Sequence, residues 1–252
     1  MIEVFILSIV QGITEFIPVS SSAHLILISN YFKFNNSSLT LDVSLHLGSL
    51  LAIITYFKKD IINFSKNKNI FLKILISSVP TMIVGYFLAY YSIIDYLRSF
   101  KLIGWMTIIF GILLYLSDLK QKTKSIENNY NFKTAICIGL FQILALVPGV
   151  SRSGIVLTGA RFLNFNRIDS VKISFLMSIP ILLVVSIFNL RNLYIENNFE
   201  FSIINFLGII FSFIFSYLTI KFFLKFLKKF NLTIFVVYRI ILGSVILFFS
   251  YL

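Results

Sequence analysis

The stretch Val147-Pro148-Gly149-Val150-Ser151-Arg152-Ser153-Gly154 is rich in small residues and ends an apolar run that begins at residue 132. Another short apolar run, 155–163, follows it. Crossing a bilayer as a helix takes about 20 apolar residues, so neither run spans one by itself. Irregular backbone at membrane depth is tolerated only where protein buries it or a wet cavity adjoins it. This stretch therefore predicts a helix–loop–helix hairpin that re-enters the side it came from.

The N-terminus carries a second hairpin of the same kind. Its apolar run, 2–17, leads into Pro18-Val19-Ser20-Ser21-Ser22-Ala23-His24, and a short apolar run over 25–32 follows. Glu3 stands where a secretory signal would have a basic flank, so we expect no cleavable signal peptide.

The composition excludes a soluble protein. Of the 252 residues, 58% are hydrophobic and 13% are charged, with 29 Phe and 12 Tyr, whereas about a quarter of a soluble domain is charged. The single cysteine, Cys137, cannot form an internal disulfide. A cytosolic enzyme, a disulfide-rich secreted domain and a disordered chain are excluded, which leaves a polytopic helical membrane protein.

Eight apolar segments can be read along the chain. They are approximately 2–17, 41–57, 70–91, 100–119, 132–147, 170–190, 201–226 and 232–252. Assigning the first and fifth to the hairpins leaves six transmembrane spans.

The distribution of basic residues supports this topology. The chain has 22 Lys and Arg against 10 Asp and Glu, a net charge of +12, which on a soluble protein would suggest nucleic-acid binding. Here most of them flank four alternate connections, and the other connections hold only Lys33, Arg98, Lys101 and Arg191. The four groups are Lys58, Lys59, Lys66, Lys68 and Lys73; Lys120, Lys122, Lys124 and Lys133; Arg161, Arg167 and Lys172; and Lys221, Lys225, Lys228 and Lys229. With two re-entrant hairpins all four groups fall on one face, which is cytoplasmic by the positive-inside rule. We therefore expect no nucleic-acid partner.

The two hairpins also predict an internal repeat within a single integral membrane domain, 1–252. The halves, approximately 2–119 and 132–252, each consist of a hairpin followed by three spans. Because three is odd, the second copy is inverted, and the hairpin tips can meet near the bilayer midplane, as in many transporters. The predicted fold class is an all-α polytopic membrane protein with six spans, two re-entrant hairpins and an inverted repeat.

The first hairpin tip gathers ionisable and hydroxyl side chains. Gln11 and Glu15 are four residues apart and share a helix face. A carboxylate, hydroxyls and an imidazole around one turn could hold a metal ion or activate a nucleophile. The alternative is that the hydroxyls bond to helix carbonyls and the histidine packs, but burying both a Glu and a His is costly. The candidates are Gln11, Glu15, Ser20, Ser21, Ser22 and His24.

The second tip places Arg152 among small residues. A guanidinium there can bind phosphate through its planar fork, and glycines allow close approach of the backbone. The alternative is an ion pair with Glu15 across the repeat, and the two roles are compatible. The surrounding candidates are Gly149, Ser151, Ser153 and Gly154. For His46, within the second apolar segment, packing is favoured over a site role.

Three stretches resemble one known family. QGITEFIPVSSSAH (11–24), LDVSLHLGSLLAI (41–53) and PGVSRSG (148–154) are similar to the signatures of the bacterial undecaprenyl-diphosphate phosphatases, which are linked to bacitracin resistance. The resemblance covers essentially the whole chain. It implies a multi-pass enzyme of the bacterial cytoplasmic (inner) membrane that hydrolyses undecaprenyl diphosphate to undecaprenyl phosphate and inorganic phosphate. That reaction recycles the lipid carrier of peptidoglycan synthesis. The implied active site faces the periplasm, the implied cofactor is Mg²⁺ or Ca²⁺, and the implied partners are the polyprenyl diphosphate, membrane lipids and, as an open alternative, a second copy of the chain.

The resemblance also assigns roles. It implies that Glu15 is the essential acid and, with Gln11, a cation ligand. It makes Ser21 the nucleophile with Ser20 beside it, His24 the catalytic histidine, and Ser151 and Arg152 the diphosphate-binding pair.

The chain departs from the family pattern in one position. Where many members have threonine, four residues after the motif arginine, it has Val156, and Thr158 would point elsewhere on a helix. Gln11 in place of Glu also leaves fewer negative ligands for a cation.

Three other classes of membrane protein can be compared with the sequence. A flippase for undecaprenyl phosphate would suit the inverted repeat equally well. A type-2 phosphatidic-acid phosphatase is excluded, because its histidine position after Ser151-Arg152 is Thr158 and its other two motifs are absent. A purely structural membrane protein would leave Glu15 and His24 unexplained at their energetic cost.

Overall fold

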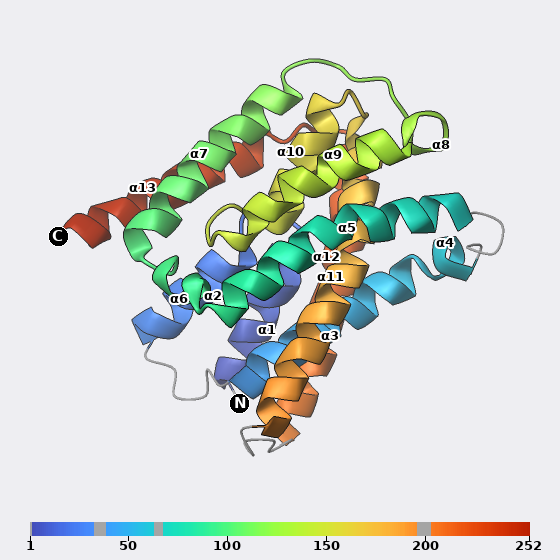
Figure 1. The fold of residues 1–252 in the computed structure, drawn as a ribbon. Helices are drawn as coiled ribbons and strands as arrows, with labels where there is room; N and C mark the ends of the chain where they lie inside the picture. Colours follow the sequence, from blue (N-terminus) through green and yellow to red (C-terminus); the bar gives the residue numbers. More distant parts are fainter. Residues whose placement is uncertain (1, 33–38, 63–67, 196–202) are drawn as a thin grey trace.

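The structure, a computed structural model, describes residues 2–32, 39–62, 68–195 and 203–252, and within these ranges it contains helices and no strand (Figure 1). The longer helices are α1 (Ile2–Thr14), α2 (Ser21–Phe32), α3 (Leu39–Tyr56), α5 (Lys68–Tyr90), α7 (Phe100–Asp118), α9 (Phe132–Ile143), α10 (Arg152–Phe162), α11 (Arg167–Ile195), α12 (Ile203–Leu227) and α13 (Thr233–Tyr251). The short ones are α4 (Lys58–Ile62), α6 (Ile93–Tyr96), α8 (Ile126–Asn129) and the 3₁₀ turn η2 (Leu144–Leu146).

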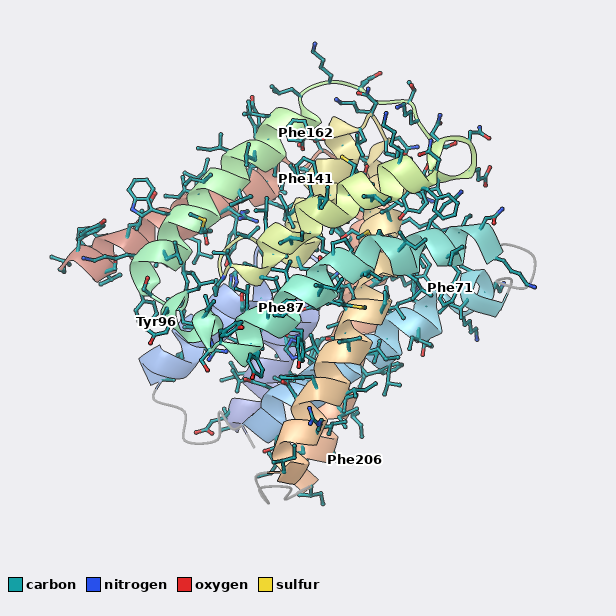
Figure 2. All side chains as sticks on the ribbon, in the orientation of Figure 1. Phe71, Phe87, Tyr96, Phe141, Phe162 and Phe206 are labelled. Carbon is teal, nitrogen blue, oxygen red and sulfur yellow. The ribbon has the colours of Figure 1, made fainter. Side chains whose placement is uncertain are left out.

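The polytopic helical membrane protein expected from composition is confirmed. Five helices are long and apolar enough to cross a bilayer: α5, α7, α11, α12 and α13. Large apolar side chains cover their outer faces, as Figure 2 shows for Phe87 on α5 and Phe206 on α12, which are 53% and 52% exposed. Such faces are stable against lipid and not against water. Three shorter apolar helices lie in α1, α3 and the α9–η2 segment.

Both expected helix–turn–helix tips are present and share an unusual backbone. Ser20 and Ser151 each precede a helix, α2 and α10, with φ of 77° and 73°. Residues other than glycine rarely adopt this left-handed backbone conformation, because it is strained. Such strained residues cluster at functional sites. In each tip the hydroxyl of this serine lies 3.3 Å from the hydroxyl two residues on, Ser22 or Ser153. The two turns are therefore built alike.

The first helix of each hairpin packs against a long helix. α1 packs on α12 and α9 packs on α5, while α7 packs on α13 and α3 on α12 and α11. Gly12 of α1 meets the backbone of α12 at Ser216, and Gly139 of α9 meets the backbone of α5 at Ser77. A Cβ at either glycine would collide with main-chain atoms, so close helix approach requires glycine there, as is common in membranes.

The connections that carry the four basic groups contact one another. Lys172 of α11 pairs with Asp60 of α4 at 2.7 Å. The Lys124 backbone N–H donates to Asn164 O at 3.0 Å, which joins the α7–α9 connection to the α10–α11 turn. Figure 1 shows α4 and α8 at one end of the bundle and both chain termini away from it.

Asp118, at the end of α7, contacts the connection between α12 and α13, which follows the fourth basic group. It accepts hydrogen bonds from Arg167 Nε at 2.9 Å and from the Leu232 backbone N–H at 3.3 Å. It also pairs with the buried Arg161 at 2.9 Å. These contacts join parts of all four connections, as expected if the connections share a face; Lys66 lies outside the described residues.

Candidate functional site

The two hairpin tips meet at one cavity of about 220 Å³. Hydroxyl and charged side chains contribute to its lining, and so do aliphatic side chains. The polar lining is Thr14, Glu15, Ser20, Ser21, Ser22, His46, Thr81, Ser151 and Arg152. The apolar lining is Ala145 and Leu146 from η2 with Ile181, Leu182 and Val185 from α11. A cavity lined by both polar and apolar side chains suits an amphipathic ligand.

Two of the polar lining residues, Arg152 and Glu15, form an ion pair. Arg152 Nη2 donates to Glu15 Oε1 at 2.6 Å, and the two side chains are 12% and 7% exposed. The other carboxylate oxygen, Oε2, accepts from Ser21 Oγ at 2.9 Å and from Gln11 Nε2 at 3.2 Å. The pairing expected as an alternative role for Arg152 is therefore present. An incoming anion would compete with Glu15 for this guanidinium.

The tips are fixed to each other and to α11. Ser153 Oγ donates to Ile17 O of the first tip at 3.0 Å, and Ser174 Oγ of α11 donates to Ser153 O at 3.2 Å. Arg152 Nη1 donates to Ser174 O at 3.1 Å. Ser151 caps α10 by accepting from the Gly154 N–H at 3.2 Å. Neither tip can shift far without breaking these bonds.

The predicted site residues divide into two sets. Six of them line the cavity: Glu15, Ser20, Ser21, Ser22, Ser151 and Arg152. The other five do not line it: Gln11, which is buried and bonds to Glu15; Gly149, Ser153 and Gly154, which shape the second tip; and His24. Gly149 has φ of 94°, so this turn favours glycine.

His24 is not among the residues that line the cavity. Its Nδ1 lies 2.7 Å from Ser20 O, and its Nε2 lies 2.6 Å from the hydroxyl of Tyr238 on α13. The two rings stack with centroids 5.7 Å apart. Both ring nitrogens are therefore engaged, and the residue connects the first tip to α13.

The position that departs from the family pattern offers no hydroxyl to the cavity. Val156 is fully buried in the core. Thr158, two residues on, donates to Gly154 O of its own helix at 2.8 Å, as expected from its place on the helix.

Arg239 of α13 is a central residue whose contacts the sequence did not predict. It is fully buried, and its guanidinium donates to carbonyls of three segments. They are Thr107 O at 3.1 Å on α7, Pro18 O at 3.2 Å in the first tip, and Gly149 O at 2.9 Å and Val150 O at 3.0 Å in the second. One cation thus holds both tips from behind. The available signal was an arginine inside an apolar segment, which is costly without partners.

His46 of α3 is the second residue whose place differs from expectation. The sequence favoured packing, but the side chain lines the cavity together with Glu15 and Arg152. Its Nδ1 lies 2.8 Å from Asp42 O, one turn earlier on the same helix. Hydropathy places a residue in a span but does not say which neighbour it faces.

The site offers oxygen ligands to a cation. Gln11 Oε1 is buried without a hydrogen-bond partner, and it lies next to the Glu15 carboxylate. Among the described residues no group of three or more His, Cys, Asp or Glu could hold a metal ion. Mg²⁺ is commonly held by one or two carboxylates plus substrate phosphates and water, so the donors present fit a cation shared with a phosphate ligand.

Comparisons with known proteins agree on one family. The model of the family "Bacitracin resistance protein BacA" matches residues 4–245. The undecaprenyl-diphosphatase of Pelagibacter ubique is 51% identical over 249 residues, which is 98% of this chain and 96% of that protein. Those of Campylobacter curvus and Saccharophagus degradans are 40% and 39% identical, each covering at least 94% of both chains.

Proposed function

The chain belongs to the family of the bacitracin resistance protein BacA, and from this membership we propose how its cavity performs the reaction. It is an undecaprenyl-diphosphatase, a membrane hydrolase that converts undecaprenyl diphosphate to undecaprenyl phosphate and inorganic phosphate. The observation that carries the mechanism is the Arg152–Glu15 pair in a cavity lined by serines and by aliphatic side chains of η2 and α11.

The proposed topology has six spans, α3, α5, α7, α11, α12 and α13, and two re-entrant hairpins, α1–α2 and α9–α10. Contacts between the connections before α9 and after α10 support it, since they bring both ends of that hairpin to one face. The alike tips at Ser20 and Ser151 support an inverted repeat. By the positive-inside rule the basic face is cytoplasmic, and we propose that the cavity opens to the periplasmic side of the bacterial inner membrane.

Arg152 is the proposed phosphate ligand. It starts α10, and Ser21 starts α2, so both helices begin at residues that line the cavity. Helix N-termini carry partial positive charge and free N–H groups, which favour an anion. A diphosphate would draw the guanidinium fork away from Glu15 and gain bidentate hydrogen bonds.

Ser21 is the proposed nucleophile or the residue that positions the attacking water. Its hydroxyl donates to Glu15 Oε2, which orients its lone pairs away from the carboxylate. Catalysis of phosphoryl transfer consists mainly of positioning and charge stabilisation, and Ser20 and Ser22 add hydroxyls to the same wall. The acid–base role that the resemblance gives His24 stays a prediction, and its contacts with Ser20 and Tyr238 support a role in positioning the tip.

Glu15 and the orphan Gln11 Oε1 are the proposed ligands of a divalent cation. Such an ion, when bound, neutralises charge on the phosphate oxygens. The Glu15 carboxylate that Arg152 releases on binding diphosphate would then keep a positive partner.

The polyprenyl chain is proposed to leave the cavity between η2 and α11. Val185 stands at the outer rim, 36% exposed, while Leu182 is buried. We expect Val185→Trp to raise the KM for undecaprenyl diphosphate at least about tenfold, which equals ~1.4 kcal/mol, because the indole would fill the outlet. Val184→Trp is the matched control, since Val184 is 40% exposed but does not line the cavity. Equal KM values for the two variants in a phosphate-release assay would exclude this route.

The reaction itself is tested with purified protein in detergent. We expect phosphate release from undecaprenyl diphosphate that needs Mg²⁺ or Ca²⁺ and stops on adding EDTA. A flippase has no turnover in micelles, so absence of released phosphate would contradict the assignment.

A further inference from the structure

The chain has two histidines, and only one of them lines the cavity. We propose that His46, not assigned by the resemblance, accepts the proton of the water that attacks phosphorus. The inference rests on the proposed function and adds a catalytic residue to that same site.

The first support is position. His46 belongs to α3, which is part of neither tip. It nevertheless lines the same cavity as Ser21, Glu15 and Arg152. A general base has to reach the reacting oxygen directly or through one water, and a place on the cavity wall leaves room for such a water between His46 and a bound phosphate.

The second support is the tautomer. A carbonyl oxygen only accepts hydrogen bonds, so the 2.8 Å contact between His46 Nδ1 and Asp42 O puts a proton on Nδ1. In the neutral ring Nε2 then carries a lone pair. Within the part of the chain that the structure describes, no hydrogen bond engages this nitrogen. An anchored ring with one free basic nitrogen is the arrangement that general bases use.

The contrast with His24 strengthens the assignment. There, Ser20 O takes the Nδ1 proton and Tyr238 OH occupies Nε2. Taking up a further proton at Nε2 would require the Tyr238 hydroxyl to change from donor to acceptor, whereas His46 can take one without rearranging a described contact.

In the proposed step, the water oxygen forms a bond to phosphorus while one of the O–H bonds of that water breaks and the proton passes to His46 Nε2. The bond between phosphorus and the leaving oxygen breaks, and its electron pair stays on that oxygen. The leaving oxygen belongs to polyprenyl phosphate. His46 then returns the proton to it and is neutral again.

The test compares His46→Gln with wild type and with Leu51→Val, an exposed residue of the same helix. We expect His46→Gln to lower kcat about 100- to 10,000-fold with KM changed less than about threefold, and Leu51→Val to leave both unchanged. A merely structural role would not respond to added base, so we also expect imidazole to raise kcat of His46→Gly at least about tenfold. Melting temperature in detergent shows that each variant is folded, and the imidazole assay serves alone where His46→Gln does not fold.

Two results would overturn the inference: kcat of His46→Gln within about threefold of wild type, or no response of His46→Gly to imidazole. Failure of the proposed function is distinguishable, because wild-type protein would then release no phosphate in the same assay.

Discussion

Replacing Arg152 with alanine is expected to lower kcat/KM for undecaprenyl diphosphate at least about 1,000-fold, because charge stabilisation by a fixed cation is worth that much in phosphoryl transfer. Among the described residues that line the cavity, Arg152 is the one with a permanent positive charge. Its removal also leaves the Glu15 carboxylate, 7% exposed, without its partner. Phosphate release by purified variant and wild type measures the effect.

Two further variants separate charge from geometry at this position. Arg152→Lys keeps the charge but loses the planar fork, so we expect activity between those of alanine and wild type. Arg152→Ala combined with Glu15→Ala removes both members of the buried pair and should recover folding stability without recovering turnover. An Arg152→Ala enzyme within tenfold of wild type would remove the arginine from the mechanism.

Replacing Arg239 with methionine is expected to lower the melting temperature in detergent by about 10 °C or more. The change removes the arginine donor from four carbonyl groups, of which Gly149 O keeps a longer bond from Thr107 Oγ1 at 3.4 Å. Each buried unpaired group costs about 1–3 kcal/mol. A loss of about 4 kcal/mol corresponds to such a shift in a chain of this size. Activity should fall as well, because Pro18, Gly149 and Val150 belong to the two tips that form the cavity.

Two control variants test whether the directed hydrogen bonds of Arg239 matter. Arg239→Lys retains the charge with fewer directed donors and should lose less stability than Arg239→Met. Arg191→Met removes an exposed arginine from the end of α11 and should leave the melting temperature unchanged. An Arg239→Met protein as stable as wild type would show that the four hydrogen bonds contribute nothing.

Much of the architecture was predictable because the bilayer imposes strong rules on sequence. Apolar runs, Pro18 and Pro148 predicted the helices and the two turns, and the basic clusters predicted which connections share a face. The Arg152–Glu15 pair was predictable in outline, since each charge alone is too costly to bury.

The rest depends on contacts that leave no local pattern. The partners of Arg239 are main-chain carbonyls of segments about ninety residues or more away, and any residue can supply a carbonyl. His24 stands next to the serines in sequence, yet the turn of α2 directs its ring to Tyr238. His46 is remote in sequence and lies at the cavity.

The two strained serine turns present different chemistry from a similar backbone. When Ser20 and Ser22 are matched with Ser151 and Ser153, the residue between them is Ser21 in one turn and Arg152 in the other. Both of these residues line the cavity. A diphosphate between the turns would therefore meet a hydroxyl at one and a guanidinium at the other, so the alike turns would bind its two ends differently.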